Sequence, residues 1–344
     1  MYVLLKNHYF FRLFLLFCFL FNINCIISRE KKSTVKKGKG TREVVFYVKK
    51  NLESNEYIAR KGILADRKAP ATILVLHGYG RDKFDVGPFS LFLKDFNCMS
   101  FDFRAHGENK EDQLSTVGSD EILDVFAAVD YLRSLEDFKN KPLFVFAHSM
   151  GAATAIEAQA QYNDFKEQYS AIKELNTPNL FEAMFLDAPF SSSKDVLRRG
   201  MEKVKLGLFG YEFYIPGTGW LQEYAFNPYV QPVIMFLLKG AGMSSPIQTF
   251  VKPIEPVESI KKVTVPCYFV VCKNDAKITV EAVTEIFNNA AGYKRLWITG
   301  GRDHCDSVFS DPERYMYTVN AFFKSVLNKT IFKQPKSLVT RSPN

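Results

Sequence analysis

The chain has 344 residues, of which 47% are hydrophobic, 15% aromatic and 24% charged, and its formal net charge is +8. Such a chain can bury a large core, and it fits one generous domain after its N-terminal segment. The six cysteines lack the spacing of a disulfide framework or a metal site, so buried free thiols are expected. The alternative is a bridge from Cys98 or Cys305 to Cys267 or Cys272.

Residues 1–28 are expected to be a targeting segment. Lys6 and Arg12 precede an apolar run from Leu13 to Ile27, which has signal-peptide proportions and is short for a membrane span. No small-residue cleavage site follows the run. A signal peptide and an uncleaved membrane anchor are therefore both open, and lipid attachment at Cys25 is a further alternative.

Residues 29–42 are expected to be a basic linker. They hold a single Glu among many Lys and Arg and show no apolar periodicity, which indicates a solvated tether beside anionic lipid headgroups. The alternative is an arm that binds nucleic acid. No nucleic-acid motif follows, so the expected partner is a membrane.

Residues 43–328 are expected to form one α/β domain. Strands are predicted at 43–48 and 55–64, as an edge hairpin, and at 71–76, 97–103, 182–186, 265–272 and 293–298. Helices are predicted at 119–135, 194–205, 229–238, 280–291 and 311–327, and the stretch 143–160 reads as strand, sharp turn and helix. This alternation predicts a mostly parallel central sheet flanked by helices.

Two stretches depart from the alternation. Residues 190–260 are rich in Gly, Pro and aromatic side chains, and we expect them to form a small helical cap inserted before the penultimate strand. Residues 329–344 are polar and basic, and we expect a flexible tail.

The sharp turn at residues 147–151 carries Ser149. A serine nucleophile must stand clear of the backbone at a helix N-terminus, with small neighbours on either side. Ala147 and Gly151 meet that need, although Ala147 departs from the commoner glycine. The alternative is an ordinary buried serine at a strand-to-helix junction.

A nucleophilic serine requires a base, and a third group that orients this base. Five histidines are present, and those other than His304 lie in the targeting segment, at turns or beside Ser149. His304 is therefore the predicted base, in a Gly-rich loop after the last strand. Asp275 follows the preceding strand and is the predicted acid, with Asp187 as the substitute.

Backbone N–H groups must stabilise the negative oxygen of a tetrahedral intermediate. The N–H of Met150 follows the nucleophile at the start of a helix, and Tyr79 lies in a glycine-flanked turn. We expect these two N–H groups to form the oxyanion hole. No metal or organic cofactor is expected, since none is needed for this chemistry.

Several short motifs together resemble those of α/β-hydrolases over residues 41–328. They are His77-Gly-Tyr-Gly80, Asp102-Phe-Arg-Ala-His-Gly107, Gly118-Ser-Asp-Glu121, Ala147-His-Ser-Met-Gly-Ala-Ala153, Asp187-Ala-Pro189, Asn274-Asp275 and Asp303-His304. The chain looks similar to membrane-anchored or exported bacterial hydrolases grouped with serine aminopeptidase and monoacylglycerol-lipase-like enzymes. Asp303 departs from the small residue that is commoner before the histidine.

The resemblance implies the same site: Ser149 as nucleophile, His304 as base, Asp275 as acid, and an oxyanion hole from Tyr79 and Met150. It implies cleavage of a carboxylic ester, with a lipid or acyl ester favoured. Two alternatives stay open. One is a serine aminopeptidase that reserves Glu212 or Glu223 for a substrate amino group, and the other is a silent, membrane-tethered binding module.

Overall fold

The computed structural model describes residues 40–51, 53–108, 114–202, 205–208, 211–214 and 253–342. The chain divides into two compact units, Met1–Gly38 and Lys39–Asn344, and every described residue belongs to the second. The expected targeting segment thus lies outside the described residues. Within the described ranges, no helix has both the length and the apolar character needed to span a bilayer.

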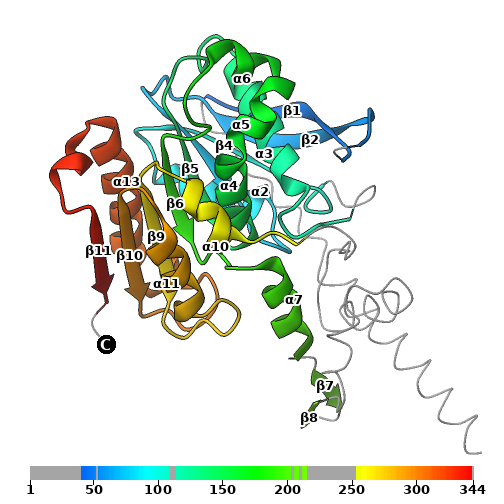
Figure 1. The fold of residues 1–344 in the computed structure, drawn as a ribbon, viewed down its shortest axis with the longest axis vertical. Helices are drawn as coiled ribbons and strands as arrows, with labels where there is room; N and C mark the ends of the chain where they lie inside the picture. Colours follow the sequence, from blue (N-terminus) through cyan, green and yellow to red (C-terminus); the bar gives the residue numbers. More distant parts are fainter. Residues whose placement is uncertain are drawn as a thin grey trace, which may run out of the picture. The chain divides into compact units, whose positions relative to one another are not determined.

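A nine-stranded sheet forms the centre of the second unit (Figure 1). Its strand order is β1-β2-β4-β3-β5-β6-β9-β10-β11. Only the pairs β1–β2 and β2–β4 are antiparallel, so the sheet is mostly parallel, as the sequence predicts. The strands are β1 Thr41–Lys49, β2 Tyr57–Ala65, β3 Thr72–Leu76, β4 Asn97–Phe101, β5 Leu143–His148, β6 Ala183–Asp187, β9 Cys267–Cys272, β10 Lys294–Thr299 and β11 Ser337–Arg341.

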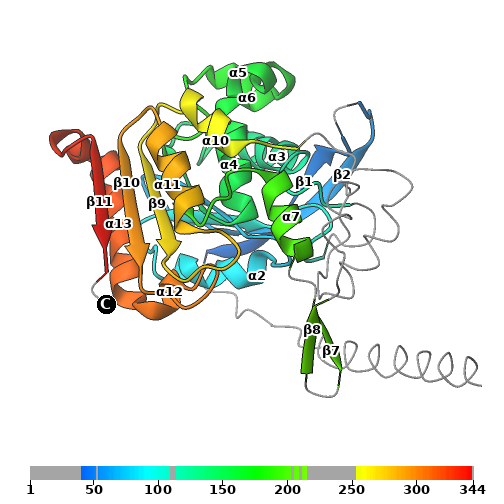
Figure 2. The same cartoon turned by 60° about the horizontal axis from the view of Figure 1, so that its bottom comes forward.

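Helices cover both faces of this sheet. Figure 2 shows α3, α4 and α11 on one face, with α2, α12 and α13 on the other. The helices are α2 Lys83–Val86, α3 Glu121–Ser134, α4 Met150–Ala160, α5 Tyr162–Phe165, α6 Ser170–Leu175, α10 Pro256–Ser259, α11 Val280–Asn289, α12 Ser307–Ser310 and α13 Pro312–Leu327. Short 3₁₀ turns are η1 Gly87–Leu91, η2 Lys166–Gln168, η3 Ile260–Lys262 and η4 Thr330–Lys333.

Two hydrophobic cores lie on opposite faces of the sheet because strand side chains alternate in direction. In β3, Leu74 and Leu76 join the core under α3 and α4, whereas Ile73 and Val75 join the core under α13. All six residues of β5 are buried, which explains the continuous apolar run that the sequence shows there. The central strand is therefore held from both sides, and the turn that follows it has a rigid base.

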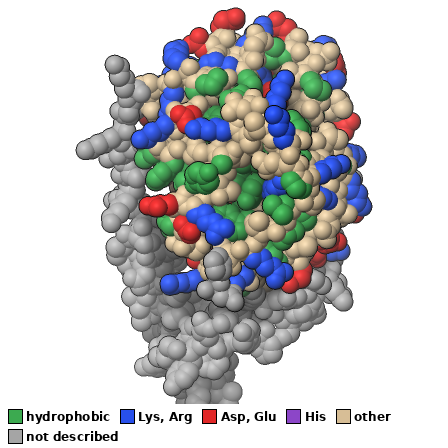
Figure 3. All heavy atoms as spheres, turned by 90° about the vertical axis from the view of Figure 1, so that its left-hand side faces the viewer, with side chains coloured by type: hydrophobic (Ala, Val, Ile, Leu, Met, Phe, Trp, Pro, Cys, Tyr) green, Lys and Arg blue, Asp and Glu red, His purple; other side chains and the backbone are tan. Residues whose placement is uncertain are grey.

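The C-terminal edge of the sheet differs from expectation. Within the expected flexible tail, Ser337–Arg341 forms β11, which pairs in parallel with β10. Figure 3 views this side and shows hydrophobic side chains among many Lys and Arg. Phe332, Leu338 and Val339 are exposed, so the strand has no amphipathic pattern by which the sequence could have revealed it.

The insertion between β6 and β9 corresponds to the expected cap. Its described part has helix α7 (Ser193–Glu202), as predicted, and an unpredicted antiparallel pair, β7 Lys205–Leu208 and β8 Tyr211–Tyr214. Hydrogen bonds join its two ends, where Ser193 N–H donates to the Ile254 carbonyl and Val257 N–H donates to the Ser191 carbonyl. The second predicted helix, at 229–238, lies outside the described residues.

Candidate active site

The turn after β5 has a conformation that an L-residue rarely adopts. Ser149 has φ 50° and ψ −117°, and helix α4 begins at the next residue. The neighbours must be small, because a Cβ on Gly78 would lie 3.1 Å from the Cβ of Ser149. The Ser149 N–H donates to the Asp187 carbonyl at 2.8 Å, which ties the turn to β6. The strained turn thus holds the hydroxyl at the carboxyl end of the sheet.

Three side chains far apart in the sequence meet at this turn in one hydrogen-bonded line. The Ser149 Oγ lies 2.8 Å from Nε2 of His304. Nδ1 of the same ring lies 2.7 Å from Oδ2 of Asp275. The side chain of Asp275 is fully buried and that of His304 is 15% exposed. This geometry lets the imidazole accept the serine proton while the carboxylate holds the other ring nitrogen.

The Asp275 carboxylate is fixed by the turn that follows β9. Its Oδ1 accepts hydrogen bonds from the N–H groups of Lys277 and Ile278, both at 2.8 Å. This is the turn-forming role that aspartate commonly plays, and here it leaves Oδ2 pointing at His304. The same residue therefore shapes the loop and contacts the imidazole.

Asp187, the substitute acid in the sequence prediction, has a different partner. Its Oδ2 accepts a hydrogen bond from the Tyr315 hydroxyl at 2.6 Å. The side chain is buried at the end of β6, and among the described residues its hydrogen bond is to Tyr315 and not to His304. The structure thus places Asp275, and not Asp187, against the imidazole.

The two expected oxyanion-hole residues flank the serine. Met150 is the first residue of α4, where a backbone N–H has no acceptor within its own helix. Tyr79 is half-buried in the turn after β3, and its ring packs edge-on against His106 with centroids 5.3 Å apart. Gly78, beside Tyr79, is in contact range of Ser149, so both predicted N–H groups belong to the turns that border the hydroxyl.

His77 has a structural role in holding the Tyr79 turn. Its Nε2 lies 3.0 Å from the N–H of Phe103, and its Nδ1 lies 2.8 Å from the Gly78 carbonyl. Because an amide can only donate, Nε2 must be unprotonated and Nδ1 must carry the proton. Burial lowers the pKa of His77 to about 3, so the ring stays neutral. His77 therefore fixes the backbone of the turn at which the sequence places it.

A buried ion pair joins the start of helix α2, which follows the Tyr79 turn, to the loop after β4. Lys83 Nζ lies 2.6 Å from Oδ2 of Asp102, and the Lys83 N–H donates to Oδ1 at 2.8 Å. Lys83 Nζ also reaches Glu108 at 2.7 Å. This pair was not predicted from the sequence, although Asp102 directly follows a strand, which is a common position for such a group.

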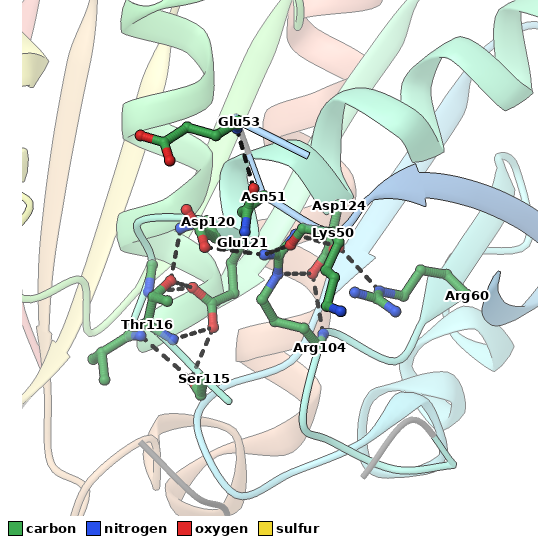
Figure 4. Close-up of polar contacts among 12 residues, drawn as sticks. Lys50, Asn51, Glu53, Arg60, Arg104, Ser115, Thr116, Asp120, Glu121 and Asp124 are labelled. Atoms are coloured by element: carbon green, nitrogen blue, oxygen red, sulfur yellow. Dashed lines mark hydrogen bonds and ion pairs between the residues drawn. The ribbon is translucent and has the colours of Figure 1, made fainter. Parts of the chain in front are cut away.

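Figure 4 shows a network of charged side chains that connects the loop after β4 to helix α3. Asp124 of α3 accepts hydrogen bonds from both Arg60 and Arg104. Burial alone would raise the pKa of Asp124, but the charges of the two arginines outweigh burial and lower it. Glu121, buried nearby, accepts from Ser115 and from the N–H of Gly118. The loop is thereby fixed by ionic contacts as well as by packing.

The remaining cysteines and histidines do not form a second site among the described residues. Cys98, Cys267, Cys272 and Cys305 are free thiols, so the alternative of a bridge between them is wrong. Cys305 Sγ lies 3.6 Å from Nε2 of His304, a contact that the sequence analysis missed. Within the described ranges, no group of His, Cys, Asp or Glu is placed to hold a metal ion.

The parallel sheet, the strained serine turn and the histidine loop after β10 define the α/β-hydrolase fold. A family model described as the alpha/beta hydrolase family matches residues 73–316. The chain therefore belongs to the alpha/beta hydrolase family.

Known proteins agree with this assignment at low sequence identity. The uncharacterized protein YqkD of Bacillus subtilis (strain 168) is 22% identical over 270 residues, which cover 78% of this chain and 75% of that protein. The Pyrococcus furiosus esterase Pf2001 has a TM-score of 0.58 at 22% identity, covering 83% of this chain and 92% of that one. A Thermogutta terrifontis esterase has a TM-score of 0.53 at 15% identity, covering 83% and 99%. At these identities the solved structures establish a shared fold.

Proposed function

We propose that the protein is a serine hydrolase that cleaves carboxylic esters through an acyl-enzyme intermediate. The observation that carries the proposal is the continuous hydrogen-bonded line from Asp275 through His304 to Ser149. Membership of the alpha/beta hydrolase family supports it, and esterases among the structures of similar fold are consistent with it.

In the first half of the reaction, the Ser149 Oγ attacks the ester carbonyl carbon while its proton passes to Nε2 of His304. The carbonyl oxygen becomes negative and is stabilised by the N–H groups of Met150 and Tyr79. Asp275 stabilises the imidazolium through Nδ1–H. The C–O bond to the alcohol then breaks, His304 returns its proton to the leaving oxygen, and the acyl group remains on Ser149.

In the second half, water takes the position of the departed alcohol. His304 removes a proton from that water, whose oxygen attacks the acyl carbon and forms a second tetrahedral intermediate. The bond to the Ser149 oxygen breaks, and His304 donates the proton back to the serine. The carboxylic acid leaves, and the site returns to its starting state with atoms and charges balanced.

The proposed substrate class is a lipid or acyl ester at a membrane. The expected targeting segment, residues 1–28, would place the enzyme there, and an aromatic-rich insertion suits an apolar acyl chain. Aromatic residues of that insertion are Phe209, Phe213, Tyr214, Trp220, Tyr224, Phe226, Tyr229 and Phe236. Apart from the backbone of Phe213 and Tyr214 in β8, they lie outside the described residues.

Labelling with a fluorophosphonate probe tests the hydrolase mechanism. We expect wild-type protein to be labelled at Ser149, and both Ser149→Ala and His304→Ala to lose the label while keeping a wild-type circular dichroism spectrum and Tm. An unlabelled, folded wild-type protein would contradict the proposal and favour the silent binding module.

A substrate series tests the ester preference. We expect p-nitrophenyl esters to be hydrolysed, with kcat/KM rising as the acyl chain lengthens, and aminoacyl anilides to be cleaved far more slowly. Faster cleavage of the anilides, dependent on a free substrate amino group, would favour the aminopeptidase alternative.

A further inference from the structure

The carboxyl group of Asp187 lies beside the site but takes no part in the proposed mechanism. Asp187 ends β6, which lies between β5, the strand before Ser149, and β9, the strand before Asp275. The Asp187 carbonyl accepts the Ser149 N–H, and within the sheet Asp187 pairs with Val270 of β9. The residue therefore lies at the centre of the sheet edge that carries the site.

The Asp187 carboxyl is only half satisfied. The side chain is 1% exposed, its Oδ2 accepts the Tyr315 hydroxyl, and its Oδ1 has no hydrogen-bond partner among the described residues. Buried polar atoms are nearly always paired, because an unpaired one loses its hydration without compensation. An unpaired oxygen on a buried carboxyl beside the site is therefore unusual and costs free energy.

The groups whose charge or hydrogen bond acts on Asp187, or on which Asp187 acts, come from three other segments. Tyr315 comes from α13, Cys272 and Asp275 come from the end of β9 and its turn, and His304 and Cys305 come from the loop after β10. Among these groups His304 is the one that can carry a positive charge. A negative charge on Asp187 would act on that imidazole through a largely water-free interior, where charge interactions are strong.

Asp187 acquires its charge near neutral pH. Burial raises the pKa of Asp187 to about 7, although the Tyr315 hydrogen bond and the charge of His304 lower it, and Asp275 raises it. The Asp187 carboxyl is therefore neutral in acid and ionised in mild alkali.

We propose that Asp187 is a positioning residue for the base, a second buried carboxyl that acts on His304 by its charge rather than by contact, with Tyr315 as the donor that holds it. The proposal rests on the proposed function, because the charge of His304 matters only when it serves Ser149. An ionised Asp187 stabilises the imidazolium that forms as Ser149 gives up its proton, so it accelerates attack at alkaline pH.

The test is the second-order rate constant for fluorophosphonate labelling of Ser149, measured from pH 5.5 to 9 and expressed as the ratio of variant to wild type. For Asp187→Asn we expect a ratio near one at pH 5.5 that falls to roughly one-tenth at pH 8.5, since the variant lacks the negative charge that stabilises the developing imidazolium.

Tyr315→Phe gives a different and independent pH dependence. Without the hydroxyl donor, Asp187 ionises at a higher pH, because hydrogen bonding to a carboxylate favours its charged form. We therefore expect a ratio that dips between pH 7 and 8 and recovers toward pH 9. This variant retains the Asp187 carboxyl, so it keeps the proposal testable if Asp187→Asn fails to fold.

Asp303→Asn is the matched control, since Asp303 is an exposed carboxylate next to His304 in the chain. Water and salt screen an exposed charge, so its ratio should stay constant with pH. Ratios for Asp187→Asn and Tyr315→Phe that are constant with pH, whatever their size, would overturn the proposal and indicate packing alone. Absence of labelling in wild type at every pH would instead refute the proposed function.

Discussion

Gly151 lies against the carbonyl group of His77 so closely that a Cβ at this position would be 2.6 Å from that oxygen. It would also lie 2.9 Å from the Cβ of Leu76. Helix α4 therefore crosses strand β3 at a distance that only glycine permits, and this approach brings the serine turn and the Tyr79 turn together.

Gly151→Ala is expected to destabilise the fold by about 1–3 kcal/mol, because the backbone of β3 must shift to admit the methyl group. Helix propensity alone would predict a small gain from alanine. Urea unfolding measures the difference. Gly87→Ala is the control, since nothing lies within 4 Å of its Cβ position. Equal stabilities for the two variants would show that the crossing can relax.

Asp275→Asn is expected to lower kcat about 10⁴-fold with little change in stability, by analogy with the same change in a Ser-His-Asp enzyme. The amide can donate to Nδ1 of His304 and so favour the wrong tautomer. Steady-state kinetics with a p-nitrophenyl ester measures the loss. If Asp187→Asn were the more damaging of the two at all pH values, the assignment of the acid would be wrong.

Asp124→Asn is expected to destabilise the protein by about 3–5 kcal/mol, because it removes the buried charge that pairs with both Arg60 and Arg104 and leaves Arg104 with only its longer ion pair to Asp120. Chemical denaturation measures the difference. The control is Glu167→Gln, which breaks the Lys173–Glu167 pair, where both side chains are 60% exposed. A solvent-exposed pair contributes at most about 1 kcal/mol, so similar losses in both variants would contradict the role of the buried network.

His148→Phe is expected to make the protein more resistant to acid. Burial lowers the pKa of His148 to about 4, so between pH 6.5 and 4 the unfolded state binds a proton that the folded state excludes. Stability from this group is fully present above about pH 6.5 and is lost as the pH falls. From pH 7 to 5, the wild type should lose up to about 2 kcal/mol more than the variant.

Phenylalanine suits this position because the ring of His148 stacks on Phe89, with centroids 5.0 Å apart, and its Nε2 has no partner among the described residues. Urea unfolding at pH 7 and at pH 5 gives the loss in free energy of unfolding between the two pH values for the wild type and for the variant. Parallel losses in wild type and variant would mean that His148 is protonated in the folded protein.

The sequence carried enough information to predict the fold and to name three side chains that the structure brings into hydrogen-bonding contact. Strands such as β5 are buried on both faces and read as unbroken apolar runs, and the order of polar residues at strand ends follows directly from parallel topology. Elimination among five histidines left His304, which the structure places 2.8 Å from Ser149.

Other features could not be predicted because their determinants are non-local. Strand β11 is recognisable only by its pairing with β10, since its own side chains are exposed. The hydrogen bond between Tyr315 and Asp187 joins residues 128 positions apart, and no sequence motif links the two positions. Periodicity reports burial along one element, whereas these contacts depend on how separate elements meet.

The two ends of the insertion lie side by side, because Val257 N–H donates to the Ser191 carbonyl and Ser193 N–H donates to the Ile254 carbonyl. Because this junction is closed by backbone contacts of its own, the length and composition of the chain between its ends can vary while the register of β6 and β9 stays fixed. Residues can therefore be inserted into or removed from this segment during evolution without displacing the strand ends on either side of it.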